Sequence, residues 1–100
     1  MNYSQAKHII FADKVRDAVR GIKKGTTLSY KEVALRAGAP GASRAVGTVM
    51  KHNFDPTVPC HRVVRSDGII GEYNRGGSSK KIKLLKDEGV TFTGPNRVLI

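Results

Sequence analysis

Apolar residues near the start of the chain recur at the spacing of a helix. Between positions 6 and 22, basic and other polar residues separate apolar residues that fall largely on one face: Ile9, Ile10, Val15, Ala18, Val19 and Ile22. This pattern predicts an amphipathic helix over 6–22. The helix should end before Gly25, because a glycine commonly follows a helix.

A pair of shorter helices is predicted next. Ser29 and Glu32 have the spacing of a capping box, in which each side chain accepts a hydrogen bond from the other residue's backbone amide. One helix therefore begins at about Tyr30 and ends at Gly38. After a turn rich in glycine and proline, a further helix covers 42–50. Two short helices joined by a tight turn indicate a helix-turn-helix.

The chain then becomes loop-rich. A loop over 53–59 leads to Cys60. Asp67 and Gly68 separate two pairs of apolar residues, a pattern typical of a tight β-hairpin, here over 63–70.

One more helix is predicted near the end. Ser78 or Ser79 can cap it, and Gly89 ends it. The last segment, 90–100, predicts no definite element. The expected fold is one domain over 1–100, mainly α with a small β-hairpin.

Composition narrows the class of partner. The 18 lysines and arginines against 8 acidic residues give a formal charge of +10 at pH 7. Such a charge favours a polyanion, and nucleic acid is favoured over anionic lipid because no segment is a strongly amphipathic surface helix. There is no apolar h-region at the N-terminus and no apolar stretch of about 20 residues, so we expect a soluble, cytoplasmic protein with no membrane partner.

The one cysteine has neighbours that can activate it. Cys60 is followed by His61 and Arg62, and basic neighbours favour the thiolate, which is the nucleophilic form of cysteine. The alternative from the residues alone is a buried, inert Cys60. A single cysteine forms no internal disulfide, and the histidines lack metal-ligand spacing, so no metal is expected.

Several segments in this order resemble one known family. They are RAVGTVM at 44–50, PCHRVV at 59–64, the turn at 66–71, Tyr73, the glycine pair 76–77 and LLKDEG at 84–89. Together they resemble the C-terminal domain of the O6-alkylguanine-DNA alkyltransferases, the methylated-DNA–protein-cysteine methyltransferases. The resemblance covers nearly the whole chain and implies a winged helix-turn-helix-like fold.

The resemblance implies a reaction and its residues. Cys60 would take the alkyl group from guanine O6 and keep it, a self-inactivating single turnover without cofactor or metal. His61 and Glu88 would relay the thiol proton, with a water between sulfur and imidazole. Tyr30 would crowd the target nucleotide's phosphate and donate a hydrogen bond to the leaving guanine, and Asn53 would brace the two halves of the site.

The resemblance also implies how DNA is held. Double-stranded DNA would be bound through its minor groove, where Arg44 replaces a flipped-out base. The small residues Ser43, Ala45 and Gly47 would let the helix backbone approach closely. The substrate pocket would be formed by Met50, Val63, Gly71 and Tyr73. In it, the backbone carbonyls of Cys60 and Val63 would contact the guanine amino group.

Three features depart from the family pattern. The usual N-terminal domain is missing, which implies either a catalytic domain that is stable alone or a separate partner in its place. The loop from Met50 to Cys60 is one residue shorter than in some members. Asn74 and Arg75 stand where many members have a single small hydroxyl residue beside the substituted oxygen.

Other functions remain open from the sequence. An alkyltransferase-like protein would bind the lesion and recruit excision repair without transfer, but such relatives typically have tryptophan or another non-nucleophile in place of Cys60. A winged-helix regulator would merely read DNA. A cysteine hydrolase is less favoured, because no oxyanion-hole motif is identifiable. In a eukaryote, the location would be nuclear.

Overall fold

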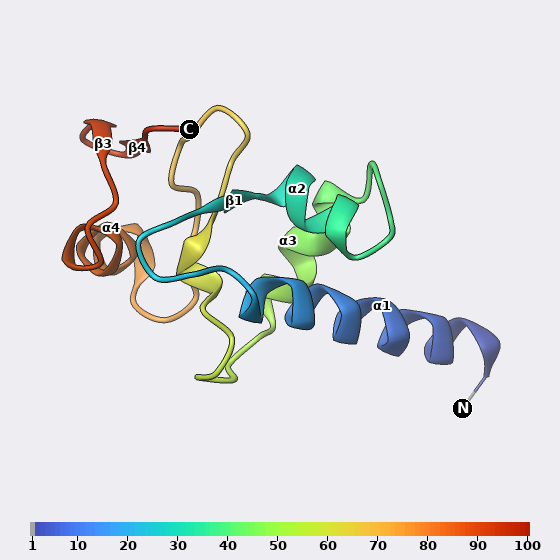
Figure 1. The fold of residues 1–100 in the computed structure, drawn as a ribbon. Helices are drawn as coiled ribbons and strands as arrows, with labels where there is room; N and C mark the ends of the chain where they lie inside the picture. The colour runs from blue at the N-terminus through green and yellow to red at the C-terminus, as the bar shows by residue number, and fades with distance from the viewer. Residues whose placement is uncertain (1) are drawn as a thin grey trace.

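The computed structural model describes residues 2–100, and its first element is the long helix α1 (Tyr3–Arg20). The predicted helix is confirmed, although it begins and ends slightly earlier than 6–22. Asn2 and Gln5 explain the earlier start, because they form a capping box. The first turns of α1 extend away from the rest of the molecule (Figure 1). Its later turns bury Val15 and Val19 completely.

The predicted helix pair is confirmed. Strand β1 (Leu28–Ser29) leads directly into α2 (Tyr30–Arg36), and the capping box between Ser29 and Glu32 is present with both bonds at 3.0 Å. Helix α3 (Ser43–Lys51) follows after a turn in which Gly38 and Gly41 have φ near +80°. That conformation favours glycine, which fits the sharp reversal between the two helices.

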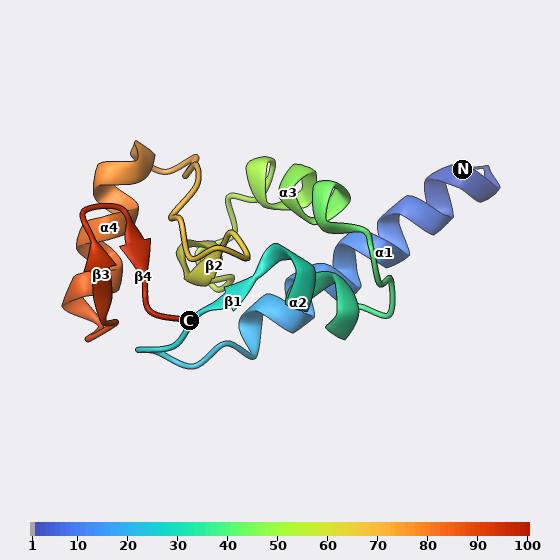
Figure 2. The ribbon, with the colours of Figure 1, turned by 90° about the horizontal axis from the view of Figure 1, so that it is seen from above.

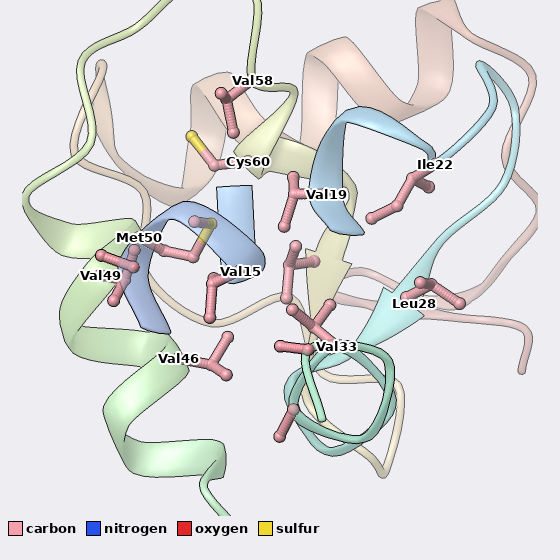
Figure 3. Close-up of a cluster of buried hydrophobic side chains, with 14 residues drawn as sticks. Val15, Val19, Ile22, Leu28, Val33, Val46, Val49, Met50, Val58 and Cys60 are labelled. Atoms are coloured by element: carbon pink, nitrogen blue, oxygen red, sulfur yellow. The ribbon is translucent and has the colours of Figure 1, made fainter. Parts of the chain in front are cut away.

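Two clusters of buried residues make the core. The larger one joins α1, α2 and α3 to the segment before Cys60, and its members include Val15, Val19, Val33, Val46, Val58 and Cys60 (Figure 3). The smaller cluster lies under α4 (Gly77–Asp87) and consists of Val64, Ile70, Leu85 and Val98. Val63 and Val64 are consecutive members of different clusters, so this short segment connects the two halves of the fold.

The predicted hairpin over 63–70 is wrong in its pairing. A tight turn is present, with Gly68 N donating to Arg65 O and Arg65 N donating to Ile69 O. However, after the 3₁₀ turn η1 (Cys60–Arg62), strand β2 (Val63–Val64) pairs in parallel with β1. Ile69 instead forms a bridge with Arg97. Only tertiary structure brings these distant partners together.

The antiparallel hairpin lies at the end of the chain, where the sequence pattern predicted no element. It consists of β3 (Phe92–Gly94) and β4 (Arg97–Val98). The predicted cap of α4 is also wrong, because Gly76, with φ of +123°, is the N-cap and neither Ser78 nor Ser79 accepts a capping bond. The expected class, mainly helical with a small hairpin, is confirmed.

Viewed from above, the molecule has two parts with a short connection between them (Figure 2). The helices α1, α2 and α3 lie on one side, and α4 with β3 and β4 lies on the other. The pair β1 and β2 lies between them. No helix in 2–100 is long and apolar enough to cross a membrane. In the same residues no group of histidine, cysteine and acidic side chains could hold a metal ion.

Candidate active site

Cys60 lies at the junction of the two parts, at the start of η1. Only 5% of the residue is exposed, and it belongs to the larger core cluster. It nevertheless lines a cavity of about 580 Å³. Cys60 is therefore buried, as expected for an inert cysteine, yet it borders a space large enough for a small ligand.

The cavity brings together much of the predicted site. Its walls include these predicted residues: Tyr30, Arg44, Gly47, Met50, Gly71 and Tyr73. They come from three separate places, namely the start of α2, helix α3 and the segment after β2. The approach is close at Gly71, where a Cβ would lie 3.5 Å from the Tyr30 hydroxyl. The positive φ of Gly71, +76°, lets the backbone turn there.

The other predicted residues do not line the cavity. Ala45 is exposed on α3 and Ser43 is half-buried at its start. Val63 is fully buried, and its carbonyl accepts a hydrogen bond from Lys81. Asn53 is also buried, but its side-chain Nδ2 has no partner among the described residues. Asn53 contacts the opposite half through its backbone carbonyl instead.

Behind Cys60, His61 is paired with a carboxylate. Nε2 of His61 lies 3.0 Å from Oε2 of Glu88, the residue that caps the C-terminal end of α4. An ionised carboxylate only accepts hydrogen bonds, so Nε2 carries the proton. With this proton on Nε2, Nδ1 is the ring atom that could accept a further proton. No direct hydrogen bond joins the ring to Cys60 within 2–100.

Arg62 keeps the Glu88 carboxyl group ionised. Its guanidinium donates to both oxygens of Glu88, at 3.0 and 2.7 Å, and to the carbonyl of Ile22 at 2.8 Å. These Arg62 bonds, with a further contribution from His61, lower the pKa of Glu88 from 4.5 to about 2, against the opposing effect of burial. Sequence reasoning treated Arg62 as a neighbour of the thiol and missed this pairing.

Two tyrosines face the cavity as neutral phenols. Burial raises the pKa of Tyr30, and the charges of Cys60 and Glu72 add to the effect. Burial and Cys60 also raise the pKa of Tyr73, although Arg75 opposes them. The Tyr73 ring meets the His61 ring edge-on at 6.4 Å between centroids. A phenol that stays protonated can donate a hydrogen bond to a ligand in the cavity.

Sequence reasoning also missed a buried lysine. Lys81 is 1% exposed, and its ammonium donates to the carbonyls of Val63 at 2.7 Å and Glu72 at 3.3 Å. Burial lowers the pKa of Lys81 to about 8, while Cys60 opposes the shift. The helical spacing offered a signal, because Lys81 is four residues before the fully buried Leu85 and so shares its face.

The fold and this geometry define a class, a helix-turn-helix domain with a single cysteine in a cavity beside its second helix. Residues 10–90 match the domain described as 6-O-methylguanine DNA methyltransferase, DNA binding domain. The chain belongs to this family. It is similar to the methylated-DNA–protein-cysteine methyltransferase of Mus musculus, with 53% identity over 74% of this chain and 36% of that protein.

Other relatives support the same assignment. The methylated-DNA–protein-cysteine methyltransferase of Methanothermobacter thermautotrophicus is 47% identical over 81% of this chain and 45% of that protein. This chain therefore spans less than half of these two relatives. The crystal structure of Mycobacterium tuberculosis OGT in complex with DNA is similar, with a TM-score of 0.75 and 44% identity over 79% of this chain and 49% of that one.

One similar structure has nearly the same length as this chain. It is S. pombe Atl1 in complex with damaged DNA containing O6-carboxymethylguanine. The TM-score is 0.75 and the identity 32%, covering 100% of this chain and 92% of that one.

Proposed function

We propose that this chain repairs DNA by transferring an alkyl group from guanine O6 to Cys60, in a single turnover that inactivates the protein. The observation that carries the proposal is the position of Cys60, which borders the cavity beside α3 and directly precedes His61, the partner of Glu88. A cysteine, a base and a group that orients the base are the parts that an activated nucleophile needs.

The proposed step balances as a displacement at carbon. The sulfur of Cys60 forms a bond to the alkyl carbon while the bond from carbon to guanine O6 breaks, and its electron pair stays on guanine. The thiol proton passes through water to Nδ1 of His61. Guanine takes up a proton from solvent water as it leaves, and His61 then returns its proton to solvent, so that sulfur loses one proton and guanine gains one. The ionised Glu88 stabilises the imidazolium. Tyr30 donates a hydrogen bond to the leaving base.

The substrate base must leave the duplex to reach this cavity. Flipping costs a few kcal/mol, which an inserted side chain partly offsets. Arg44 is suited to this insertion, because it is exposed on α3 and also lines the cavity. We therefore propose that α3 enters the minor groove of double-stranded DNA with Arg44 in the position of the flipped base.

Lesion binding without transfer is the second candidate. The structure of Atl1 supports it, because Atl1 matches all of this chain over 92% of its own length and its crystal structure is a complex with damaged DNA. Cys60 favours transfer over this alternative, because the proposed acceptor is present.

A mass measurement separates these two functions. After incubation with a duplex containing O6-methylguanine, we expect the intact protein to gain one methyl group at Cys60, located by peptide mapping. An undamaged duplex of the same sequence is the control. Binding to the damaged duplex with no mass gain would support lesion recognition and contradict transfer.

Gly47 offers a test of the DNA-facing surface. A Cβ at this position meets nothing within 4 Å, and φ is not positive, so neither packing nor backbone conformation requires glycine here. We expect Gly47→Leu to fold normally and to weaken duplex binding roughly tenfold or more, because the side chain would keep the helix from the groove. Fluorescence anisotropy with a labelled duplex measures the change. Unchanged affinity would place the DNA elsewhere.

A further inference from the structure

The segment 71–77 forms one wall of the cavity but has little structure of its own. It contributes Gly71, Tyr73 and Asn74 to the lining. Positive φ values of +76° at Gly71, +123° at Gly76 and +78° at Gly77 give it pivots at both ends. Between residues 71 and 76 no strand pairing is present. Lys81 holds the Glu72 carbonyl and Gly77 N holds the Tyr73 carbonyl. The hydrogen bonds that join this wall to α3 and to the loop after it come from its own side chains.

Asn74 attaches the wall to the end of α3. Its Nδ2 lies 2.8 Å from the carbonyls of Lys51 and Asn53 and 3.2 Å from the carbonyl of Met50. The carbonyls in the last turn of a helix have no partner within the helix. The Met50 carbonyl also accepts a turn bond from Asn53 N, so the Asn74 amide adds to the contacts at the end of α3. Met50 and Lys51 also line the cavity. Asn74 thus links one wall of the cavity directly to the other.

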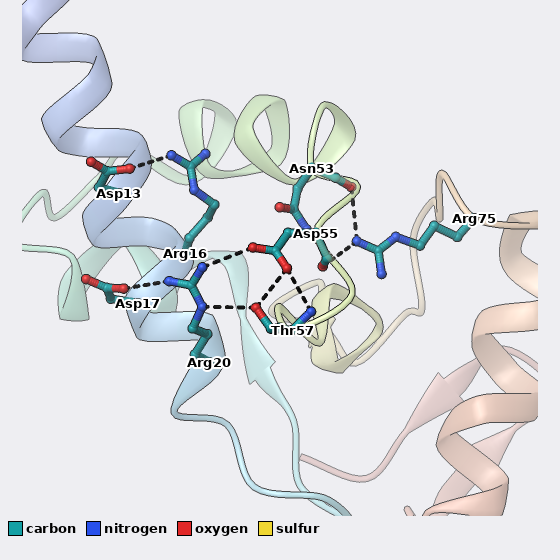
Figure 4. A network of polar contacts seen from close by, with 8 residues as sticks. All are labelled: Asp13, Arg16, Asp17, Arg20, Asn53, Asp55, Thr57 and Arg75. Atoms are coloured by element: carbon teal, nitrogen blue, oxygen red, sulfur yellow. Dashed lines mark hydrogen bonds and ion pairs between the residues drawn. The ribbon is translucent and has the colours of Figure 1, made fainter.

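Arg75 extends the attachment to the next loop. Its Nη2 donates to the carbonyl of Asp55 at 2.6 Å and lies 3.5 Å from that of Asn53. The Asp55 carboxylate in turn accepts a hydrogen bond from Arg20 at 3.2 Å (Figure 4). A continuous set of polar contacts therefore runs from α1 through the 53–57 loop to segment 71–77.

Asn53, which the sequence analysis selected, takes part in these contacts through its backbone carbonyl. Asn53 was predicted to brace the two halves, and this stays a prediction for its side chain, whose Nδ2 has no partner among the described residues. The contact between the halves is made by the Asn74 side chain on the Asn53 carbonyl. Any residue at position 53 would provide this backbone carbonyl, whereas the donor at position 74 must be a side chain with an N–H or O–H group.

We propose that Asn74 and Arg75 form a clip that fixes the distance between α3 and the wall at 71–73, and thereby sets how closely the cavity holds the alkyl group. This inference rests on the proposed transfer function. A methyl group makes few contacts of its own, so its alignment with sulfur depends on fixed walls. A benzyl group fills more of the cavity and orients itself. The clip therefore favours small alkyl groups.

Hydrogen exchange tests the clip without reference to activity. In Asn74→Ala we expect the Gly77 amide, which donates to the Tyr73 carbonyl at 3.0 Å, to exchange about tenfold faster than in the wild type, because the turn that this bond closes is held less firmly. The exchange rate should rise less in Arg75→Lys than in Arg75→Ala, because lysine keeps one charged donor. Asn96→Ala is the matched control, since Asn96 is exposed in the turn between β3 and β4. Unchanged exchange at the Gly77 amide in Asn74→Ala contradicts the clip.

Single-turnover rates test whether the clip selects alkyl groups by size. Because a small misplacement of reacting groups can cost up to a hundredfold in rate, we expect Asn74→Ala to slow methyl transfer by about tenfold. Benzyl transfer should slow less, so that the ratio of the two rates falls, while Asn96→Ala leaves the ratio unchanged. Equal slowing with both groups contradicts a role in size selection. A wild-type protein that gains no alkyl mass refutes the transfer function, whereas the exchange result still tests the clip.

Discussion

Replacement of Cys60 with alanine is expected to abolish alkyl transfer while leaving duplex affinity within about twofold of the wild type. The sulfur makes the only new covalent bond in the proposed reaction. Affinity comes mainly from basic side chains that displace counterions from the phosphates, and Cys60 is not among them. Intact mass after incubation with an O6-methylguanine duplex measures the first effect. Anisotropy with an undamaged duplex measures the second.

Two controls make this result decisive. Cys60→Ser keeps a polar side chain of similar size and should also fail to gain an alkyl group, because an un-ionised hydroxyl is a weak nucleophile. Thermal unfolding of each variant checks the core, to which Cys60 belongs. Retained transfer in a folded Cys60→Ala protein would refute Cys60 as the acceptor. Loss of duplex binding in that protein would show that the cysteine also supports the DNA-facing surface.

The second large effect is expected for Glu88→Gln, which should lower both the free energy of unfolding and the rate of transfer. The effect on unfolding comes first. The pKa of Glu88 is lowered from 4.5 to about 2, chiefly by Arg62. A depressed carboxyl pKa stabilises the folded protein above pH 4.5, and this contribution is lost as the pH falls towards 2. We expect the variant to lose about 2 kcal/mol of unfolding free energy at pH 7, less than the full shift implies because some solvent contact remains.

Urea unfolding at several pH values measures this loss. The difference between wild type and Glu88→Gln should be largest at neutral pH and should shrink below pH 4.5, where the wild-type advantage is titrated away. Asp87→Asn is the matched control, because it removes the adjacent carboxylate. Asp87 is exposed and its carboxylate pairs with the exposed Lys83 at 2.9 Å, so a change within about 0.5 kcal/mol is expected. A pH-independent difference would contradict the role of the Glu88 charge.

The same substitution tests the proton relay. Without the carboxylate charge, His61 holds a proton less readily, so transfer should slow at neutral pH. The rate should recover partly in alkaline solution, where the thiol ionises without help. Single-turnover rates measured between about pH 6 and 9 test both expectations. Superimposable profiles for wild type and variant would remove Glu88 from the mechanism and leave it a structural partner of Arg62.

Local sequence was sufficient for much of the helical framework. The capping box of Ser29 and Glu32 and the positive-φ glycines of the following turn act over a few residues, so the start of α2 and the reversal into α3 could be predicted. The cap of α4 could not be predicted by the same rules. Ser78 and Ser79 are good capping residues, but Gly76 provides the boundary instead.

Long-range pairing was beyond the sequence pattern. Asp67 and Gly68 do form a tight turn, yet Val63 and Val64 pair with Leu28 and Ser29, more than 30 residues earlier in the chain. A two-residue strand carries almost no information about its partner, because the same apolar pair can join any nearby edge. The C-terminal hairpin at 92–98 was missed for a similar reason, since its strands are too short to show alternation.

The sequence by itself determined the helix-turn-helix, the basic charge and a cysteine beside a histidine, because each depends on neighbours along the chain. Its resemblance to a family supplied candidate roles for Cys60, His61 and Glu88. Tertiary structure alone decided that Arg62 binds Glu88 and that the Asn74 side chain binds the carbonyls of Lys51 and Asn53. Such contacts depend on which buried donors meet which acceptors once the two halves pack, and spacing along the chain does not encode that.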